Sequence, residues 1–191
     1  VETAHRLGLK VAAHAHGTGG VEAAVSAGVD SIEHGTYLDE DGAKLMKRTG
    51  SYRVPTLMAF EGIREGLAED RYTPVVSEKV RQTLDVVGNG LKLAVKRGVN
   101  IAFGTDAGVF EHGRNAGEFE LMMRYGGMSA EAALKSATVD AANLLGMTSI
   151  GTIEVGQYAD IIAVDGDPLQ DIKVLENMRF VMKDGKVIDL D

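Results

Sequence analysis

The segment RLGLKVAAHAHG, residues 6–17, decides the fold class of this chain. It leaves a helix-like stretch through Gly8, which suits the left-handed position that ends a helix, and enters a short apolar run that begins at Val11. The run ends on histidine and is followed at once by Gly17, a turn residue. We therefore predict a helix-to-strand connection that places His14 at the carboxyl end of a strand.

Three further segments repeat this plan: SAGVDSIEHG (residues 26–35), TGSYRVPTLMAF (residues 49–60) and KRGVNIAFGTD (residues 96–106). They bring His34, Thr56 and Asp106 to the ends of their strands. Strands that alternate with helices form parallel sheets with right-handed crossovers. Ligands bind at the carboxyl ends of such strands, where successive loops converge. We therefore expect His14, His34 and Asp106 to lie on one rim.

Apolar residues at helical spacing predict the helices of the chain. These helices cover residues 21–27, 39–48, 77–97, 118–125 and 129–146. The third is a single long helix, and Ser129 is the expected N-cap of the last.

From residue 148 the sequence changes to short β segments, the first of them over residues 151–156. Asp184-Gly185 between alternating apolar residues is a hairpin signal. We therefore divide the chain into a parallel α/β part over residues 1–147 and a small antiparallel β part over residues 148–191.

The composition limits the kinds of site and partner. Of 191 residues, 45% are hydrophobic and 25% are charged, which is typical of a globular protein. No cysteine is present, so a metal site must use nitrogen and oxygen ligands. The net charge of -8 without a Lys/Arg cluster argues against a nucleic-acid partner. No apolar run reaches the roughly 18 residues of a membrane span, and we expect a cytoplasmic protein with no membrane partner.

His14, His34 and Asp106 are the candidate metal ligands. Neutral imidazole and carboxylate suit Zn²⁺ or a similar divalent ion, and a site with few protein ligands keeps a position open for water. A metal-bound water ionises near neutral pH if a base takes its proton, and Asp106 can be that base as well as a ligand. The competing interpretation is that each histidine is a hydrogen-bonded structural residue, which is the commoner role of a single histidine at a strand end.

Other polar residues stand near the same rim. His16, Tyr37 and His112 fall in loops where a substrate would be met, although a simple exposed position for His112 has equal support. Glu33 directly precedes His34, so strand alternation points it to the opposite face and favours either a structural role or a role that supports the ligands from behind.

These motifs, in this order, resemble the C-terminal part of the metal-dependent amidohydrolase superfamily, in its imidazolonepropionase-like and Xaa-Pro dipeptidase (prolidase) branch. The matching stretches are VAAHAHG, GVDSIEHG, VPTL, GVNIAFGTDAG, SAEAALKSATVDAANLLG, GTIEVGQYADIIAVDGDPLQDI and VMKDGKVI. The resemblance implies a (β/α)8 TIM-type barrel, of which this chain supplies strands five to eight, followed by part of a small β-sandwich. It implies that His14 and His34 are metal ligands at the ends of the fifth and sixth strands. It makes Asp106, at the end of the eighth, a metal-bound general base.

The resemblance also indicates what the chain does not supply. Such enzymes contribute an HxH pair from the first barrel strand and, in binuclear members, a carboxylated lysine from the fourth. We do not assign His14-Ala15-His16 to the first strand, because a helix end precedes it and the EHG strand follows too soon. A whole barrel takes about 250 residues. We therefore expect half a barrel that belongs to a longer protein, or that needs a complementing N-terminal segment or self-association as a homo-oligomer.

The implied activity is hydrolysis of an amide or peptide C–N bond by metal-activated water, with one or two zinc ions in the intact enzyme. The implied substrate is a dipeptide with C-terminal proline or a small acyl-amino acid, and a cyclic amide or an ester is the alternative. A scaffold that keeps the architecture without catalysis is an alternative of another class. A nucleotide-binding domain is disfavoured, because no glycine loop of the GxxxxGK type follows a strand.

Overall fold

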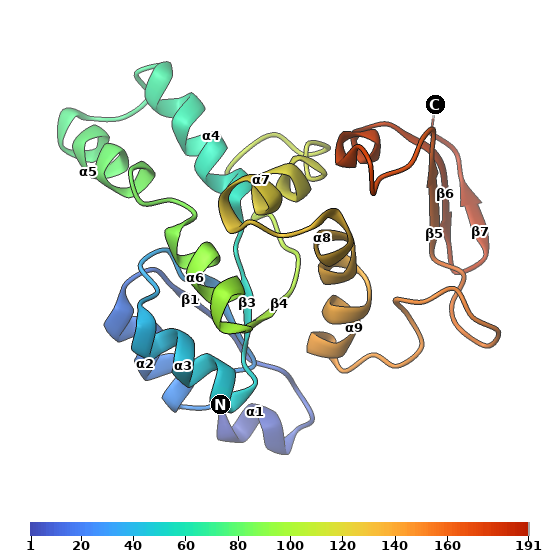
Figure 1. Ribbon diagram of the computed structural model, residues 1–191, viewed down its shortest axis with the longest axis horizontal. Helices are drawn as coiled ribbons and strands as arrows, with labels where there is room; N and C mark the ends of the chain where they lie inside the picture. Colours follow the sequence, from blue (N-terminus) through green and yellow to red (C-terminus); the bar gives the residue numbers. More distant parts are fainter. Residues whose placement is uncertain (191) are drawn as a thin grey trace.

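A four-stranded parallel sheet forms the first part of the chain in the computed structural model, which describes residues 1–190 (Figure 1). The strands are β1 (Ala12–Ala15), β2 (Ser31–His34), β3 (Tyr52–Val54) and β4 (Asn100–Ile101), and they lie in that order. Every neighbouring pair is parallel. The predicted parallel α/β fold is confirmed.

The helix α1 (Glu2–Arg6) leads into β1, and further helices return the chain from one strand to the next. Among these are α2 (Thr18–Ser26), α3 (Glu40–Thr49) and α6 (Asn89–Arg97). Glycine ends the last two of these helices in the left-handed conformation, with φ of 79° at Gly50 and 66° at Gly98. The predicted glycine C-caps therefore direct the chain into β3 and β4.

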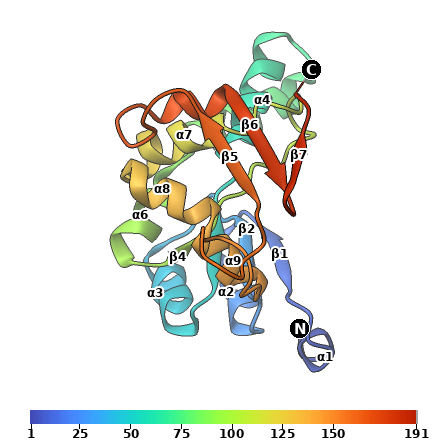
Figure 2. The same cartoon turned by 90° about the vertical axis from the view of Figure 1, so that its right-hand side faces the viewer.

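The helices α2, α3 and α6 cover one face of the sheet (Figures 1 and 2). The side chains of this core that are at most 1% exposed are Val21, Val25, Ile32, Ala43, Met46, Leu91, Ala94 and Met122. Burial of each large aliphatic side chain among them contributes about 1.5–3 kcal/mol. The other face carries Ala12 and His14 in register with Ser31 and Glu33, and both Ala12 and His14 are exposed. The sheet thus has one covered face and one open face.

The predicted single helix over residues 77–97 is wrong. The structure has two helices there, α5 (Pro74–Leu84) and α6, because Gly88 before α6 has a φ of 86°. A Cβ at this glycine would lie 2.5 Å from Cβ of Tyr125, so the chain turns where another helix passes closely. The helix α4 (Leu57–Ala68) packs against α5, and the two project together beside the sheet (Figure 1).

The helix α7 (Gly117–Gly126) is tied to the start of α4 by a buried carboxylate. Glu118 has no exposed surface, and its two oxygens accept hydrogen bonds from the backbone N–H groups of Leu57 (2.8 Å) and Met58 (2.7 Å). A carboxylate at a helix N-terminus satisfies donors that have no partner inside the helix. Glu118 therefore fixes the loop between β3 and α4.

The predicted helix over residues 129–146 is also divided, into α8 (Ala130–Ala137) and α9 (Val139–Leu145). The break falls at Thr138, which has φ −121° and ψ −94°. The predicted N-cap is confirmed, because the Ser129 side chain accepts a hydrogen bond from the N–H of Ala132 at 3.1 Å.

The last part of the chain forms a three-stranded antiparallel sheet. Its strands are β5 (Ile161–Val164), β6 (Met178–Lys183) and β7 (Lys186–Ile188), in the order β5-β6-β7. Asp184 and Gly185 both have positive φ, 51° and 72°, which confirms the hairpin between β6 and β7. The predicted β segment over residues 151–156 is a turn region rather than a strand. A full β-sandwich stays a prediction.

A short 3-10 helix, η1 (Ile172–Glu176), connects this sheet to the parallel part. Its Ile172 and Leu175 are buried against Phe119 of α7 and against Ala130 and Ala133 of α8. The part after residue 147 is therefore anchored on α7 and α8 through η1. Among residues 1–190, no helix is both long and apolar enough to cross a membrane.

Candidate metal centre

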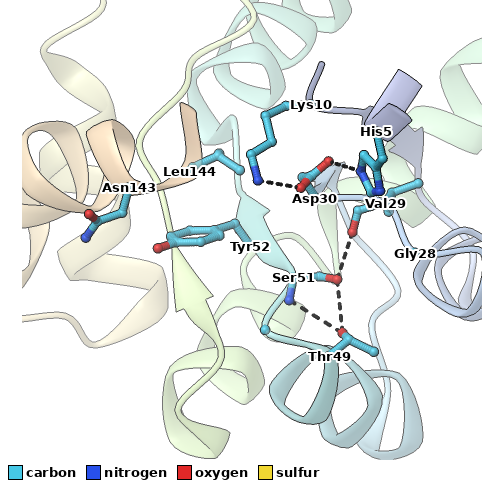
Figure 3. A pocket seen from close by; sticks show the side chains of 11 residues that line it. His5, Lys10, Gly28, Val29, Asp30, Thr49, Ser51, Tyr52, Asn143 and Leu144 are labelled. Carbon is cyan, nitrogen blue, oxygen red and sulfur yellow. Dashed lines mark hydrogen bonds and ion pairs between the residues drawn. The ribbon is translucent and has the colours of Figure 1, made fainter. Parts of the chain in front are cut away.

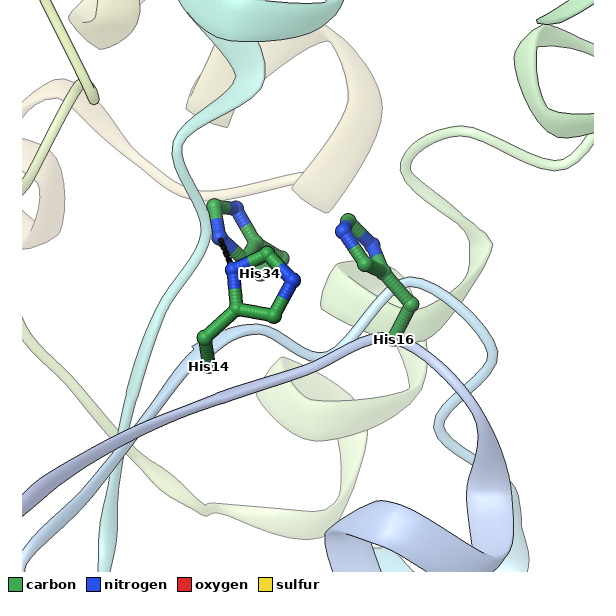
Figure 4. A group of neighbouring side chains, drawn as sticks. All are labelled: His14, His16 and His34. Atoms are coloured by element: carbon green, nitrogen blue, oxygen red, sulfur yellow. Dashed lines mark hydrogen bonds between the residues drawn. The ribbon is translucent and has the colours of Figure 1, made fainter.

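Three histidine rings converge at the carboxyl edge of the parallel sheet (Figure 4). His14 belongs to β1, His16 follows that strand, and His34 ends β2. One nitrogen of each ring lies within 4.8 Å of the others. The ring centroids are 4.4 Å apart for His14 and His34, and 4.6 Å for the stacked rings of His16 and His34.

His34 reaches the cluster because it leaves the strand conformation. Its register partner is Ala15, a core residue on the helix-covered face. A φ of 68° turns the His34 ring toward the other histidines instead. The prediction that Glu33 points away from the site is wrong for the same reason. Glu33 pairs with His14 in the register and shares its face.

Arg53 holds the backbone of His34 in this turned conformation. The side chain is almost fully buried, with 2% exposure, and it donates two hydrogen bonds to the His34 carbonyl oxygen, from Nε at 3.0 Å and from Nη2 at 2.8 Å. Burial lowers the pKa of Arg53 to about 9, against the opposing effect of Glu118, so the guanidinium stays charged at neutral pH. Charge-assisted hydrogen bonds of this kind are strong.

Thr56 fixes the tautomer of the His34 ring. Its hydroxyl donates to the carbonyl oxygen of Pro55 at 2.8 Å, so at 2.7 Å it accepts the proton of His34 Nδ1–H. His34 Nε2 therefore carries the lone pair, and this atom lies 2.9 Å from Nδ1 of His14. An imidazole whose second nitrogen is held by a hydrogen bond is the usual arrangement of a metal ligand.

Burial favours the neutral form of two of the three histidines, His34 and His16. It lowers the pKa of His34 to about 4, assisted by the neighbouring His16 and His14 and opposed by Asp106. Burial, and then His14, also lowers the pKa of His16. Neutral imidazole is the form that binds a metal ion.

The nitrogen spacing fits a divalent cation. Two nitrogens bound to one tetrahedral zinc at about 2.0–2.1 Å would stand about 3.3 Å apart. The 2.9 Å between His34 Nε2 and His14 Nδ1 is close to this value. These two rings can therefore share one ion after a small movement.

Asp106 was predicted to end its strand, but β4 ends at Ile101 and Asp106 lies five residues later in the following loop. It is exposed and in the left-handed conformation, with a φ of 54°. It raises the pKa of both His16 and His34, so its charge acts on the cluster. It also contributes to the raised pKa of Glu33, whose main cause is burial. The group of described residues whose ligand atoms lie within 4.8 Å of one another consists of the three histidines and does not include Asp106.

The residues predicted to meet substrate occupy three different environments. His16 is a full member of the cluster, and its Nδ1 lies 2.8 Å from the hydroxyl of Thr36. Tyr37 is 41% exposed, and its hydroxyl lies 3.1 Å from that of Thr83. His112 is exposed in the loop before α7, outside the histidine cluster. Sequence reasoning missed Arg53, for which a lone arginine inside the apolar segment YRVP was the available signal.

A hollow of about 320 Å³ lies at the opposite edge, before the amino ends of β2 and β3 (Figure 3). Its charged groups pair with one another, since Lys10 and His5 both contact Asp30 at 2.8 Å. Burial opposes the ionisation of Asp30, but hydrogen bonds from Lys10, the Val11 N–H and His5 outweigh it and lower the pKa of Asp30 to about 2. This network joins α1, β1 and β2, and we assign it a structural role.

Comparison with known proteins gives a consistent set of relatives. The sequence matches the model of the Amidohydrolase family over residues 1–188. A crystal structure of a Xaa-Pro dipeptidase with bound methionine in the active site is 44% identical, with a TM-score of 0.93, and the match covers 98% of this chain and 47% of that one.

Two curated relatives match at a similar level. Ochratoxinase of Aspergillus niger is 35% identical over 196 residues, which cover 98% of this chain and 39% of that protein. Its crystal structure has a TM-score of 0.85, with 98% of this chain and 43% of that one covered. An uncharacterized protein of Mycobacterium tuberculosis is 36% identical over 190 residues, or 97% of this chain and 50% of that protein. The chain spans half or less of the length of these relatives.

Proposed function

Because this chain belongs to the amidohydrolase family, we propose that it supplies part of the active site of a metal-dependent hydrolase that cleaves an amide or peptide C–N bond with activated water. The observation that carries the proposal is the histidine cluster at the carboxyl edge of the parallel sheet. Ligand sites of parallel α/β folds lie at this edge. Imidazole nitrogens that lie close together and are oriented by hydrogen bonds are a suitable ligand set for zinc.

We assign His14 and His34 as ligands of a divalent metal ion, with zinc as the first candidate and one or two ions in the intact enzyme. Asp106 is the further ligand, from the loop that follows β4. His16 faces the substrate, with Thr36 orienting its ring. The relation to the family and the chemistry of the donors support this assignment.

When bound, the metal ion polarises the substrate carbonyl and lowers the pKa of water. Asp106 accepts the proton of the attacking water and delivers it to the leaving nitrogen as the C–N bond breaks. His34 keeps its lone pair directed into the site because Thr56 holds its Nδ1–H. Arg53 holds the His34 backbone so that the ring cannot turn back toward the core.

A dipeptide or an acyl-amino acid is the proposed substrate class. The similarity to a Xaa-Pro dipeptidase favours a C-terminal proline as the first residue to test. A cyclic amide or an ester, cleaved by the same activated water, is the alternative within this chemistry.

We further propose that other strands complete the site by covering the open face of the sheet. The strands β1 and β4 are its two edges, and each has an unpaired side. A complementing N-terminal segment or a second copy in a homo-oligomer would pair with them. A compact monomer of residues 1–191 in size-exclusion chromatography, together with a single cooperative transition in urea unfolding, would contradict this. A cytoplasmic location stays a prediction.

Metal analysis of the purified full-length protein tests the assignment. We expect bound zinc in the natural sequence and loss of most of it in His14→Ala and His34→Ala. Asp106→Asn should retain more metal than the histidine variants and hydrolyse alanyl-proline at least about a hundredfold more slowly, the scale of a lost general base. Lys92→Met, an exposed substitution on α6, is the control. Unchanged metal content in both histidine variants would contradict the site. Full metal content without hydrolysis of dipeptides, acyl-amino acids, cyclic amides or esters would favour a scaffold.

A further inference from the structure

A hollow of about 350 Å³ opens beside the histidine cluster, between α4 and α5. Most of its wall is aliphatic or aromatic. The apolar side chains that line it are Phe60, Ile63, Val76, Val80 and Leu84. Phe60 is buried in the core, whereas Val76 is 42% exposed. The hollow is therefore an apolar recess with a firm base on α4 and an accessible rim on α5.

His16 belongs both to this hollow and to the metal-binding cluster. Its ring stands edge-on to Phe60, with the centroids 6.2 Å apart. His16 is therefore a wall shared by the two, and the hollow adjoins the cluster.

Lys79 supplies the only charged side chain of the hollow lining. In the described part of the chain, Lys79 takes part in none of the ion pairs. The hydroxyls of Tyr37 and Thr83 contact each other at 3.1 Å in the same lining. A cation without a protein partner at the rim of an apolar recess is complementary to an apolar group that carries a carboxylate.

We propose that this hollow binds the leaving-group amino acid of the substrate, with an apolar side chain against α4 and α5 and a free carboxylate on Lys79. The inference rests on the proposed hydrolysis and specifies its substrate class as N-acylated apolar amino acids with a free carboxylate. In the reaction, water adds its oxygen to the acyl carbon, the C–N bond breaks, and the amino acid nitrogen takes a proton. Lys79 and Val76 are then specificity residues rather than catalytic residues.

Two probes separate the carboxylate from the side chain. N-acetyl-L-leucine carries both, and N-acetyl-L-leucinamide has the same acyl bond and side chain without the charge. Hydrolysis of either by the zinc-loaded full-length protein releases a primary amine that can be measured. Calorimetric titration of the metal-free protein measures binding of both probes without any turnover.

Neighbouring positions provide matched controls. Lys79→Met removes the cation of the hollow, and Lys92→Met removes an exposed cation of α6 that does not line it. Val76→Asp places a charge in the hollow, and Val75→Asp places the same charge on α5 at a position that is 70% exposed and outside the lining. Circular dichroism of all four variants verifies that each is folded.

We expect kcat/KM and affinity to favour N-acetyl-L-leucine over its amide by about tenfold, the value of one charge-assisted hydrogen bond. Lys79→Met should remove this preference and Lys92→Met should keep it. Val76→Asp should weaken both probes about tenfold relative to Val75→Asp, because an apolar group would meet a charge. A preference that survives in Lys79→Met, or equal effects of Val76→Asp and Val75→Asp, would overturn the inference.

The two readouts distinguish this inference from the proposed function. If the probes are hydrolysed but Lys79→Met and Val76→Asp do not have the expected effects, the proposed function stays in place and the hollow is refuted as the leaving-group site. Binding with the expected pattern, but without hydrolysis of either probe, of alanyl-proline, or of a cyclic amide or an ester, supports the hollow and contradicts the proposed activity. Absence of binding refutes the hollow, and absence of hydrolysis of all these compounds contradicts the proposed activity as well.

Discussion

The substitution Gly90→Ala is expected to destabilise the loop that follows His34, although it adds a single carbon atom. A Cβ at this position would lie 2.7 Å from the carbonyl oxygen of Gly35, 2.9 Å from Nη1 of Arg53 and 3.0 Å from the carbonyl oxygen of Thr36. Two of these atoms are backbone and the third belongs to a buried guanidinium, so none can move freely. Overpacking of this kind costs about 1–3 kcal/mol, and the better helix propensity of alanine returns at most about 1 kcal/mol. We expect a net loss of about 1–2 kcal/mol in the free energy of unfolding.

Gly19→Ala is the matched control, because Gly19 and Gly90 each stand second in a helix, α2 and α6. A Cβ at residue 19 meets nothing within 4 Å, so this change should stabilise by up to about 1 kcal/mol. Urea unfolding followed by circular dichroism measures both variants. Gly90→Ala should also weaken zinc binding, since Arg53 holds the His34 carbonyl. If Gly90→Ala unfolds at the same urea concentration as Gly19→Ala, the loop and Arg53 adjust without cost and the reasoning is refuted.

Three further predictions concern single hydrogen-bonding groups. Thr56→Val removes the acceptor of His34 Nδ1–H and should weaken zinc affinity about 10–100-fold. Thr56→Ser keeps a hydroxyl and should restore the affinity. Equal zinc affinities of these two variants would contradict the assigned tautomer. Asp30 has a pKa of about 2 in the folded protein, below its ordinary value near 4. At pH values above 4, this difference contributes about 2 kcal/mol to the free energy of unfolding. That stability should disappear as the pH falls from 4 toward 2, and Asp30→Asn should unfold with a flatter pH dependence over this range. Glu118→Gln places an amide N–H₂ against the N–H of Leu57 or Met58 and should cost about 1–3 kcal/mol in urea unfolding; unchanged stability would mean that α4 does not depend on this cap.

The strand ends were predictable because they follow a local rule. A glycine, a short apolar run and a polar residue recur at His14, His34 and Asp106, and parallel topology brings such ends to one edge. The orientation of His34 was not predictable in this way, because alternation along the strand fails at a residue with a φ of 68°. That conformation depends on Arg53, which lies on a different strand.

The helix boundaries failed where a distant residue decides them. The spacing of apolar residues runs through Gly88 without interruption, but the close approach of Tyr125 requires the chain to turn there. Membership of His16 in the cluster also depends on the placement of His34 by another strand. Local patterns therefore identified the edge that holds the site, and contacts between elements determined its geometry.

The position of α5 gives the fold a region that can be redesigned with little risk to folding. Ser77 is the one buried residue of this helix, so most substitutions along α5 should change the free energy of unfolding by no more than about 0.5 kcal/mol. The strands that carry the histidine cluster depend instead on α2, α3 and α6. A library of variants at the α5 positions that face the hollow would therefore explore new ligand preferences while the clustered histidines keep their support. Divergence among natural homologues is expected to concentrate on the same helix.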